Sequence, residues 1–363
     1  MERQYSLPHS TIEFHFRQSA RDFVVDEIPL YPFSGEGEHL VLHIRKKNLS
    51  TWQMLDIFSN HLGIKSRDIG YAGLKDKNAQ TKQYISLPKK FEPMLENFDH
   101  EGIKILERHY HNNKIRMGHL KGNRFFIRLK KVNPTSAYKI HEALKAIKKN
   151  GIPNYFGFQR FGTDGENYLK GKAILEGTFK EKNKKLHQFY LNAYQSYLFN
   201  GWLSRRVQIS KLIESFTPHE LLNELSLPLA EIEQMKKQKH PFKLIHGDVL
   251  MHYPHGKIFH YEGDDEIARF DTHDISVTGL LSGKRATRAI EEASAIEQTF
   301  DTITKDIDGA RRYGWIYPQE IEGIYKENEA WFELHFTLPK GSYATVLIEE
   351  IAKRPIQSDE EQD

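Results

Sequence analysis

The stretch GYAGLKDKNAQTKQY, residues 70–84, predicts two β-strands joined by a polar turn. A short strand near residues 69–72 leads into the turn, and a strand of alternating polar and apolar residues runs through residues 84–87. Asp76 lies in the turn, with a lysine on either side. Because loops between strands commonly display reactive groups, this turn is the first candidate for a functional site.

On the N-terminal side of this stretch, the sequence predicts two more strands and a helix. Residues 23–30 (FVVDEIPL) and 39–47 (HLVLHIRKK) are rich in β-branched and apolar residues, as strands are. Ser50 and Gln53 have the spacing of a capping box, which predicts that a helix begins directly after Ser50. Gly63 is expected to end that helix.

On the C-terminal side, residues 121–132 (KGNRFFIRLKKV) predict a basic strand. Phe125 and Phe126 point to opposite faces of this strand, so at most one of them is expected in the core. A helix over residues 136–149 follows, with Tyr138 expected among its buried residues. The order strand, strand, helix, strand, strand, helix predicts an α+β domain, with helices on one side of a mostly antiparallel sheet.

The composition changes from Gly151 onward, which suggests a second domain. This part begins rich in glycine and aromatic residues, continues with many lysines over residues 170–185, and then predicts an aromatic helix over 186–203. Strand-like alternation returns in residues 331–338 (WFELHFTL). A chain of 363 residues is long enough for two domains. We therefore expect the middle of the chain to be an insertion and the C-terminal part to complete the first sheet.

The composition excludes several classes of chemistry. The chain has no cysteine, which excludes disulfides, thiolate metal sites, cysteine nucleophiles and zinc deaminases that need a paired-cysteine motif. No run of eighteen apolar residues is present and the first residues do not form a secretory signal, so we expect a soluble cytoplasmic protein without a membrane segment. A net charge of +3 permits a nucleic-acid partner without requiring one.

Two segments combine residue types that suit chemistry on RNA. Lys75 and Lys77 flank Asp76, and their positive charges are expected to lower its pKa and keep a nucleophilic carboxylate available. The aromatic and basic residues of 121–132 suit an RNA base stacked on a ring while cations hold the phosphates. Judged from these residues alone, an ordinary solvated turn and an amphipathic strand with core phenylalanines are the simpler interpretations, and both stay open.

Four segments, in this order along the chain, resemble the TruD family of tRNA pseudouridine synthases: GYAGLKDKNAQTKQY, LKGNRFFI, GIPNYFGFQRFG and LPKGSYAT. The resemblance extends from about Phe23 to the helix after Tyr343. It implies a monomeric isomerase that converts a tRNA uridine, at position 13 of the D arm, to pseudouridine without cofactor or metal. It also implies a catalytic domain over 1–150 plus 317–363, interrupted by a TruD-specific α/β domain over 151–316.

The resemblance also assigns roles to individual residues. Asp76 matches the family nucleophile, which would cleave the glycosidic bond either by attack on the sugar or by a glycal route. Phe23, Asn123 and Tyr343 match substrate-binding positions, and Phe125 matches the aromatic residue beside the extruded base.

Tyr343, Tyr194 and Gln195 depart from the family pattern, whereas Arg17 is a further match. Tyr343 stands where the family often has Phe, which keeps a stacking face and adds a hydroxyl. Tyr194 and Gln195 stand where small residues and an arginine are common. Arg17 matches a basic position that would pair with Asp76.

Two other classes of function would use the same residues. A tRNA-binding or chaperone protein without catalysis would use the same basic and aromatic surface. A metal-dependent RNA nuclease would use Asp76 with some of the nineteen histidines, although no HExxH pattern accompanies them. Mapping of pseudouridine in tRNA, with and without a chelator, separates these functions from isomerisation.

Overall fold

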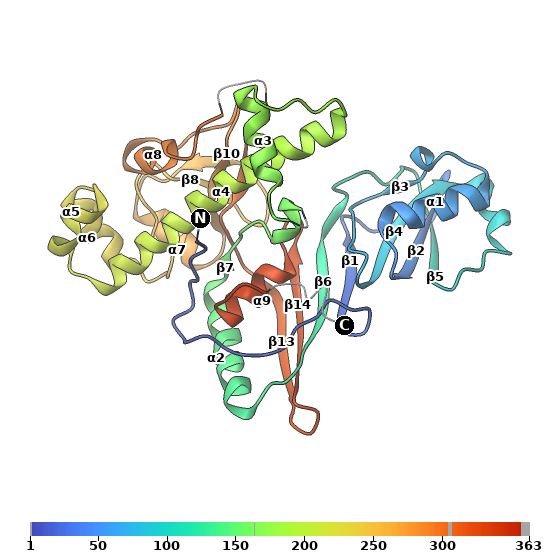
Figure 1. The fold of residues 1–363 in the computed structure, drawn as a ribbon, viewed down its shortest axis with the longest axis horizontal. Coiled ribbons are helices and arrows are strands. Elements are labelled where there is room, and N and C mark those ends of the chain that lie inside the picture. Colours follow the sequence, from blue (N-terminus) through green and yellow to red (C-terminus); the bar gives the residue numbers. More distant parts are fainter. Residues whose placement is uncertain (1, 163, 304–306, 357–363) are drawn as a thin grey trace. The chain divides into compact units, whose positions relative to one another are not determined.

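Residues 2–162, 164–303 and 307–356 are described by the computed structural model (Figure 1). The chain divides into two units, each built from segments far apart in the sequence. The first, which we call the sheet unit, comprises Thr11–Leu144, Pro318–Gly341 and Pro355–Asp363. The second, the helical unit, comprises Met1–Ser10, Lys145–Tyr317 and Ser342–Arg354.

The predicted domains do not coincide with these units along the whole chain. Residues 1–10 and 342–354 belong to the unit that also holds the middle of the sequence. The division into a catalytic domain of 1–150 plus 317–363 and an inserted domain of 151–316 stays a prediction.

The sheet unit is built on eight strands, in the order β13-β14-β6-β1-β4-β2-β5 with β3 paired to β4. Their bounds are β1 (Phe23–Pro29), β2 (His39–Lys47), β3 (Gly70–Tyr71), β4 (Gln80–Pro88), β5 (Ile103–His111), β6 (Leu120–Leu129), β13 (Gln319–Lys326) and β14 (Trp331–Pro339). Apart from the parallel pair β1 and β4, neighbouring strands run antiparallel. The predicted α+β class with a mostly antiparallel sheet is confirmed. The C-terminal strand β14 pairs with β6, so the C-terminal part does complete this sheet.

Helix α1 (Thr51–Leu62) covers part of the sheet and has the ends that the sequence predicted. Ser50 and Gln53 form the reciprocal capping box, and Gly63 ends the helix in the left-handed conformation that glycine accommodates. Its apolar side chains pack in one core with those of β2 and β4; this core includes Leu40, Leu42, Ile44, Met54, Leu55, Phe58, Ile85 and Leu87.

The capping box provides a stability prediction. Ser50→Ala removes the side chain that accepts the Gln53 backbone N–H, so the free energy of unfolding should fall by about 1 kcal/mol. Urea denaturation followed by circular dichroism measures this change. Ser50→Thr, which keeps the accepting oxygen, serves as the control, and an equal loss in both variants would contradict a role for the cap.

Helix α2 (Pro134–Asn150) corrects one prediction about its buried face. Tyr138 is 68% exposed, although it was expected to be buried. Ala137, Ile140 and Leu144 occupy the buried face instead, at the three- and four-residue spacing of a helix. Tyr138 lies one residue beyond Ala137, about 100° around the helix, and therefore faces solvent.

The helical unit is organised around the long helix α4 (Lys184–Ser215), which contains and extends the predicted aromatic helix. The other helices are α3 (Asn167–Glu176), α5 (Pro218–Leu225), α6 (Leu229–Lys237), α7 (Asp264–Asp271), α8 (Glu291–Gln298) and α9 (Ala344–Ala352). The strands are β7 (Ile152–Pro153), β8 (Val249–His252), β9 (Ile258–His260), β10 (Ile275–Leu281), β11 (Ala310–Tyr313) and β12 (Trp315–Ile316). Four of them form a sheet in the order β11-β10-β8-β9, and β12 pairs with β7.

The core of the helical unit forms where α4 meets these strands. Phe199, Trp202 and Leu203 of α4 share one buried cluster with Val277 of β10 and Trp315 of β12. Within the described part of the chain, no helix is both long enough and apolar enough to cross a membrane.

Candidate active site

Asp76 lies in the loop between β3 and β4 of the sheet unit, and the residue is exposed. The backbone of this loop is fixed on both sides of the carboxylate. The N–H of Lys75 donates to Thr51 Oγ1 at 2.9 Å, and Lys46 Nζ donates to the carbonyl oxygen of Asp76 at 3.0 Å. A carboxylate carried by an exposed residue on a fixed backbone is suited to contact a substrate in a defined orientation.

Lys75 connects the Asp76 loop to two strands of the sheet. Its Nζ lies 2.7 Å from Glu27 Oε2 and donates to Asn123 Oδ1 at 2.6 Å. Glu27 on β1 and Asn123 on β6 are direct neighbours across the sheet. The side chains of Lys75 and Glu27 are only 6% and 1% exposed, so Lys75 is a buried structural cation and not a solvated neighbour of Asp76. Through it, the structure brings the predicted residue Asn123 to the loop of Asp76.

Lys46 is a residue of this site that the sequence reasoning missed. It is fully buried at the end of β2, and its Nζ donates to the carbonyl oxygens of Leu49 at 2.6 Å and Asp76 at 3.0 Å. Burial, with a smaller contribution from the charge of Lys75, lowers the pKa of Lys46 to about 8, while the Asp76 carboxylate opposes this shift.

The sequence did carry a signal for this lysine. In HLVLHIRKK, Lys46 continues the series Leu40, Leu42 and Ile44 that faces the core at every second position. A lysine at an inward-facing position of a strand is unusual enough to mark it as a candidate.

The pKa of Asp76 corrects the sequence-based expectation. We expected neighbouring lysines to lower it, but the pKa of Asp76 is raised above its ordinary value of 3.8. Although the residue is exposed, the surrounding protein removes part of the hydration of its carboxylate, and this loss outweighs the opposing charges of Lys46 and Lys75. Lys77 is not among the causes of the shift.

Phe23 and Phe125, predicted to contact the substrate, lie in the core of the sheet unit. They are 2% and 6% exposed, and their ring centroids are 6.1 Å apart. Phe125 also stacks on Phe336 of β14, with centroids 5.3 Å apart. Phe126, on the opposite face of β6, is only partly buried, which confirms that one ring of this pair enters the core. The roles of Phe23 and Phe125 in binding a substrate stay predictions.

Tyr343 belongs to the helical unit, whereas Asp76, Phe23, Asn123 and Phe125 belong to the sheet unit. It precedes α9 and contacts Phe156 edge to face, with ring centroids 6.2 Å apart. The end of the segment LPKGSYAT therefore contacts the segment GIPNYFGFQRFG within the helical unit. The role of Tyr343 in substrate binding stays a prediction.

Arg17 makes no ion pair with Asp76 within residues 2–162, 164–303 and 307–356; the cations that act on this carboxylate are Lys46 and Lys75. The predicted pairing of Arg17 with Asp76 is therefore wrong. Over the same residues, no group of three or more histidine and acidic side chains is placed to hold a metal ion.

Lys46 provides a pH-dependent prediction. Lys46→Met should lower kcat about tenfold, because the loop carrying Asp76 loses one anchor. The charge of Lys46 lowers the pKa of Asp76, so its removal raises that pKa further and moves the acidic limb of the pH–rate profile to higher pH. The native protein should also lose activity above about pH 8, where Lys46 loses its proton. Lys46→Arg keeps the charge and should show no such alkaline loss. Unchanged profiles in Lys46→Met would contradict this role.

Comparison with known proteins gives one consistent result. The sequence profile of the family described as tRNA pseudouridine synthase D (TruD) matches residues 2–186 and 176–351. A tRNA pseudouridine synthase D of Sulfurimonas denitrificans is 58% identical, over 98% of this chain and 100% of the relative. A tRNA pseudouridine synthase D of Wolinella succinogenes is 55% identical, over 99% of this chain and 100% of the relative. A solved structure from Methanosarcina mazei, described as a tRNA pseudouridine synthase D, has the same fold, with a TM-score of 0.68 at 21% identity over 97% of this chain and 96% of that one.

Proposed function

The chain belongs to the TruD family of tRNA pseudouridine synthases, and on this premise we propose that it isomerises a tRNA uridine to pseudouridine, with Asp76 as the catalytic group. We propose position 13 in the D arm as the target. The observation that carries the proposal is the exposed residue Asp76, with its partly desolvated carboxylate, on a loop that Lys46, Lys75 and Thr51 hold in place. A substrate base extruded from its stack has access to such a group.

The proposed reaction breaks the bond between uracil N1 and C1′ of the ribose and forms a bond between C5 and C1′. The proton on C5 leaves to solvent and N1 takes up a proton, so the product is an isomer and no electrons are gained or lost. The Asp76 carboxylate starts the reaction in its ionised form, either by attack on the sugar or by a glycal route. We propose that neither cofactor nor metal takes part.

The surrounding residues support this role of Asp76. The positive charges of Lys46 and Lys75 oppose the desolvation of Asp76 and favour its ionised form. Asn123 accepts from Lys75 through Oδ1, which leaves its amide N–H groups to donate to a uracil carbonyl. Asn123 is therefore the group that we propose to hold the base while it turns. Phe23, Phe125 and Tyr343 complete the proposed set of substrate contacts.

The proposal also covers the domain organisation, the oligomeric state and the cellular location. We propose a catalytic domain of residues 1–150 plus 317–363 and an inserted domain of 151–316. We further propose that the protein acts as a monomer in the cytoplasm.

The test is a nucleotide-resolved map of pseudouridine in an unmodified tRNA transcript after incubation with the purified protein, with and without EDTA. We expect pseudouridine at position 13 in equal amount under both conditions. Binding of the transcript without any pseudouridine would support a chaperone instead. Cleavage of the transcript that EDTA prevents would support a metal-dependent nuclease.

A further inference from the structure

The first observation is a column of aromatic rings on the α3–α4 hairpin of the helical unit. Tyr168 and Tyr197 stack with centroids 4.0 Å apart and planes 4° from parallel. Tyr194 continues the column, nearly parallel to Tyr197 with centroids 6.5 Å apart, and Phe161 packs edge-on against Tyr168. All four rings are partly exposed. Parallel rings open to solvent form a preformed platform for another flat ring.

A cavity of about 180 Å³ lies beside this column. Its wall includes Phe161, Tyr168 and Tyr197, together with Tyr155 and Phe156. A cavity of roughly 150 Å³ lined by apolar side chains holds one benzene molecule, so this cavity has the size for a single heterocyclic ring.

Several polar groups of the cavity wall are paired within the helical unit. Asn200 uses both ends of its amide on the backbone of Phe156, and Ser204 donates to the carbonyl oxygen of Glu2. Arg3 and Glu349 form an ion pair with each other. The wall therefore offers ring faces more than hydrogen-bonding groups, an arrangement that accepts a nucleobase with little preference for its identity.

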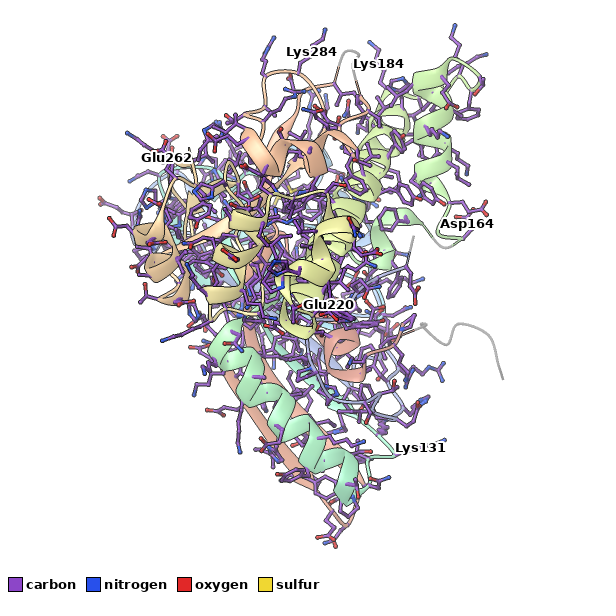
Figure 2. All side chains as sticks on the ribbon, turned by 90° about the vertical axis from the view of Figure 1, so that its left-hand side faces the viewer. Lys131, Asp164, Lys184, Glu220, Glu262 and Lys284 are labelled. Atoms are coloured by element: carbon purple, nitrogen blue, oxygen red, sulfur yellow. The ribbon has the colours of Figure 1, made fainter. Side chains whose placement is uncertain are left out.

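The second observation is the charge of the same hairpin. Residues 170–185 hold six lysines and two glutamates, so this segment has a net charge of +4, whereas the complete chain has +3. The six lysines are exposed: Lys170, Lys172, Lys180, Lys182, Lys184 and Lys185. Figure 2 shows this part of the chain, with Lys184 labelled. Such a concentration of positive charge attracts a polyanion.

We propose that the α3–α4 hairpin is a second RNA contact, at which an unpaired base of the tRNA stacks on Tyr168 and Tyr197 while the lysines of 170–185 hold its phosphates. The combination of flat ring faces with a local excess of cations is the arrangement that single-stranded RNA fits. The choice of tRNA as the partner rests on the proposed function.

The contact contributes affinity and takes no part in the chemical step. Tyr197→Ala is therefore expected to weaken tRNA binding about tenfold, within the range of roughly 5- to 150-fold that loss of one stacked base gives. The single-turnover rate at saturating tRNA should stay unchanged. Tyr197→Phe keeps the ring and should bind like the native protein. Tyr138→Ala, which removes an exposed tyrosine elsewhere, is the matched control.

Two further probes separate stacking from charge. An oligouridylate has bases and phosphates, whereas inorganic polyphosphate has phosphates alone. Tyr197→Ala should lose affinity for the oligouridylate and keep its affinity for polyphosphate. Replacement of Lys180 and Lys182 by glutamine should weaken binding of both probes and reduce the salt dependence.

Native tRNA affinity in Tyr197→Ala would overturn the proposal. An equal loss of tRNA affinity in Tyr197→Phe would also overturn it. The same holds if Tyr197→Ala loses affinity for polyphosphate as much as for the oligouridylate. Binding of an acidic peptide in competition with the oligouridylate, and equally sensitive to Tyr197→Ala, would identify a protein partner instead. A native protein that binds tRNA through Tyr197 without forming pseudouridine would contradict the proposed function and leave this contact standing.

Discussion

Replacing Asp76 by asparagine is expected to lower the rate of pseudouridine formation by about 10⁴-fold or more, the scale on which removal of a catalytic nucleophile acts. The amide has nearly the shape of the carboxylate but neither its charge nor its nucleophilicity. Because the C5 proton is released when the new bond forms, tRNA labelled with tritium at C5 of uridine reports the rate as tritium in the solvent.

Binding of tRNA should change little in Asp76→Asn, since the backbone contacts from Lys46 and Thr51 to this loop do not involve the carboxylate. Asp68→Asn, at another exposed aspartate of the sheet unit, is the matched control and should retain native activity. A loss of tRNA affinity as large as the loss of rate would show that Asp76 acts in binding and not in the chemical step.

The second large effect is expected from Lys75→Met. This change leaves Glu27 as a buried carboxylate without its cation and leaves Asn123 Oδ1 without its donor. Breaking a buried ion pair in this way costs about 3 kcal/mol or more of stability. The loop that carries Asp76 also loses its connection to β1 and β6, so kcat should fall about 100-fold. Thermal unfolding and the tritium assay measure the two effects.

Lys77→Met is the matched control for this change, because Lys77 flanks Asp76 on its other side. Lys77 is exposed and forms no ion pair within the described residues. The Lys77→Met protein should therefore retain a stability and a kcat close to those of the native protein. Equal losses in the two lysine variants would show that general positive charge matters, and not the buried contacts of Lys75.

Local sequence patterns predicted much of the sheet unit. The alternation in β6 predicted that Phe125 and Phe126 lie on opposite faces of the strand, and Ser50, Gln53 and Gly63 predicted both ends of α1. The order of the strands could not be predicted in the same way. The parallel pairing of β1 with β4, for example, joins Val24 to Gln80, and pairing over such separations depends on the packing of the whole sheet.

The site was predictable in its residue types but not in its electrostatics. The two lysines beside Asp76 look equivalent in the sequence, yet Lys75 is buried against Glu27 and Lys77 is exposed. The direction of the Asp76 pKa shift was also predicted wrongly, since desolvation depends on the surrounding protein and not on the adjacent residues. The burial of Lys46, by contrast, could have been predicted, because Lys46 occupies an inward-facing position in the alternating pattern of β2.

The central claim is that the Asp76 carboxylate converts a tRNA uridine to pseudouridine. The most direct test is a nucleotide-resolved count of pseudouridine in an unmodified tRNA transcript after incubation with excess native or Asp76→Asn protein. We expect complete conversion of one uridine by the native protein and no detectable conversion by the variant. Pseudouridine formed by the Asp76→Asn protein at the native rate would contradict the claim, as would a native protein that binds the transcript and leaves every uridine unchanged.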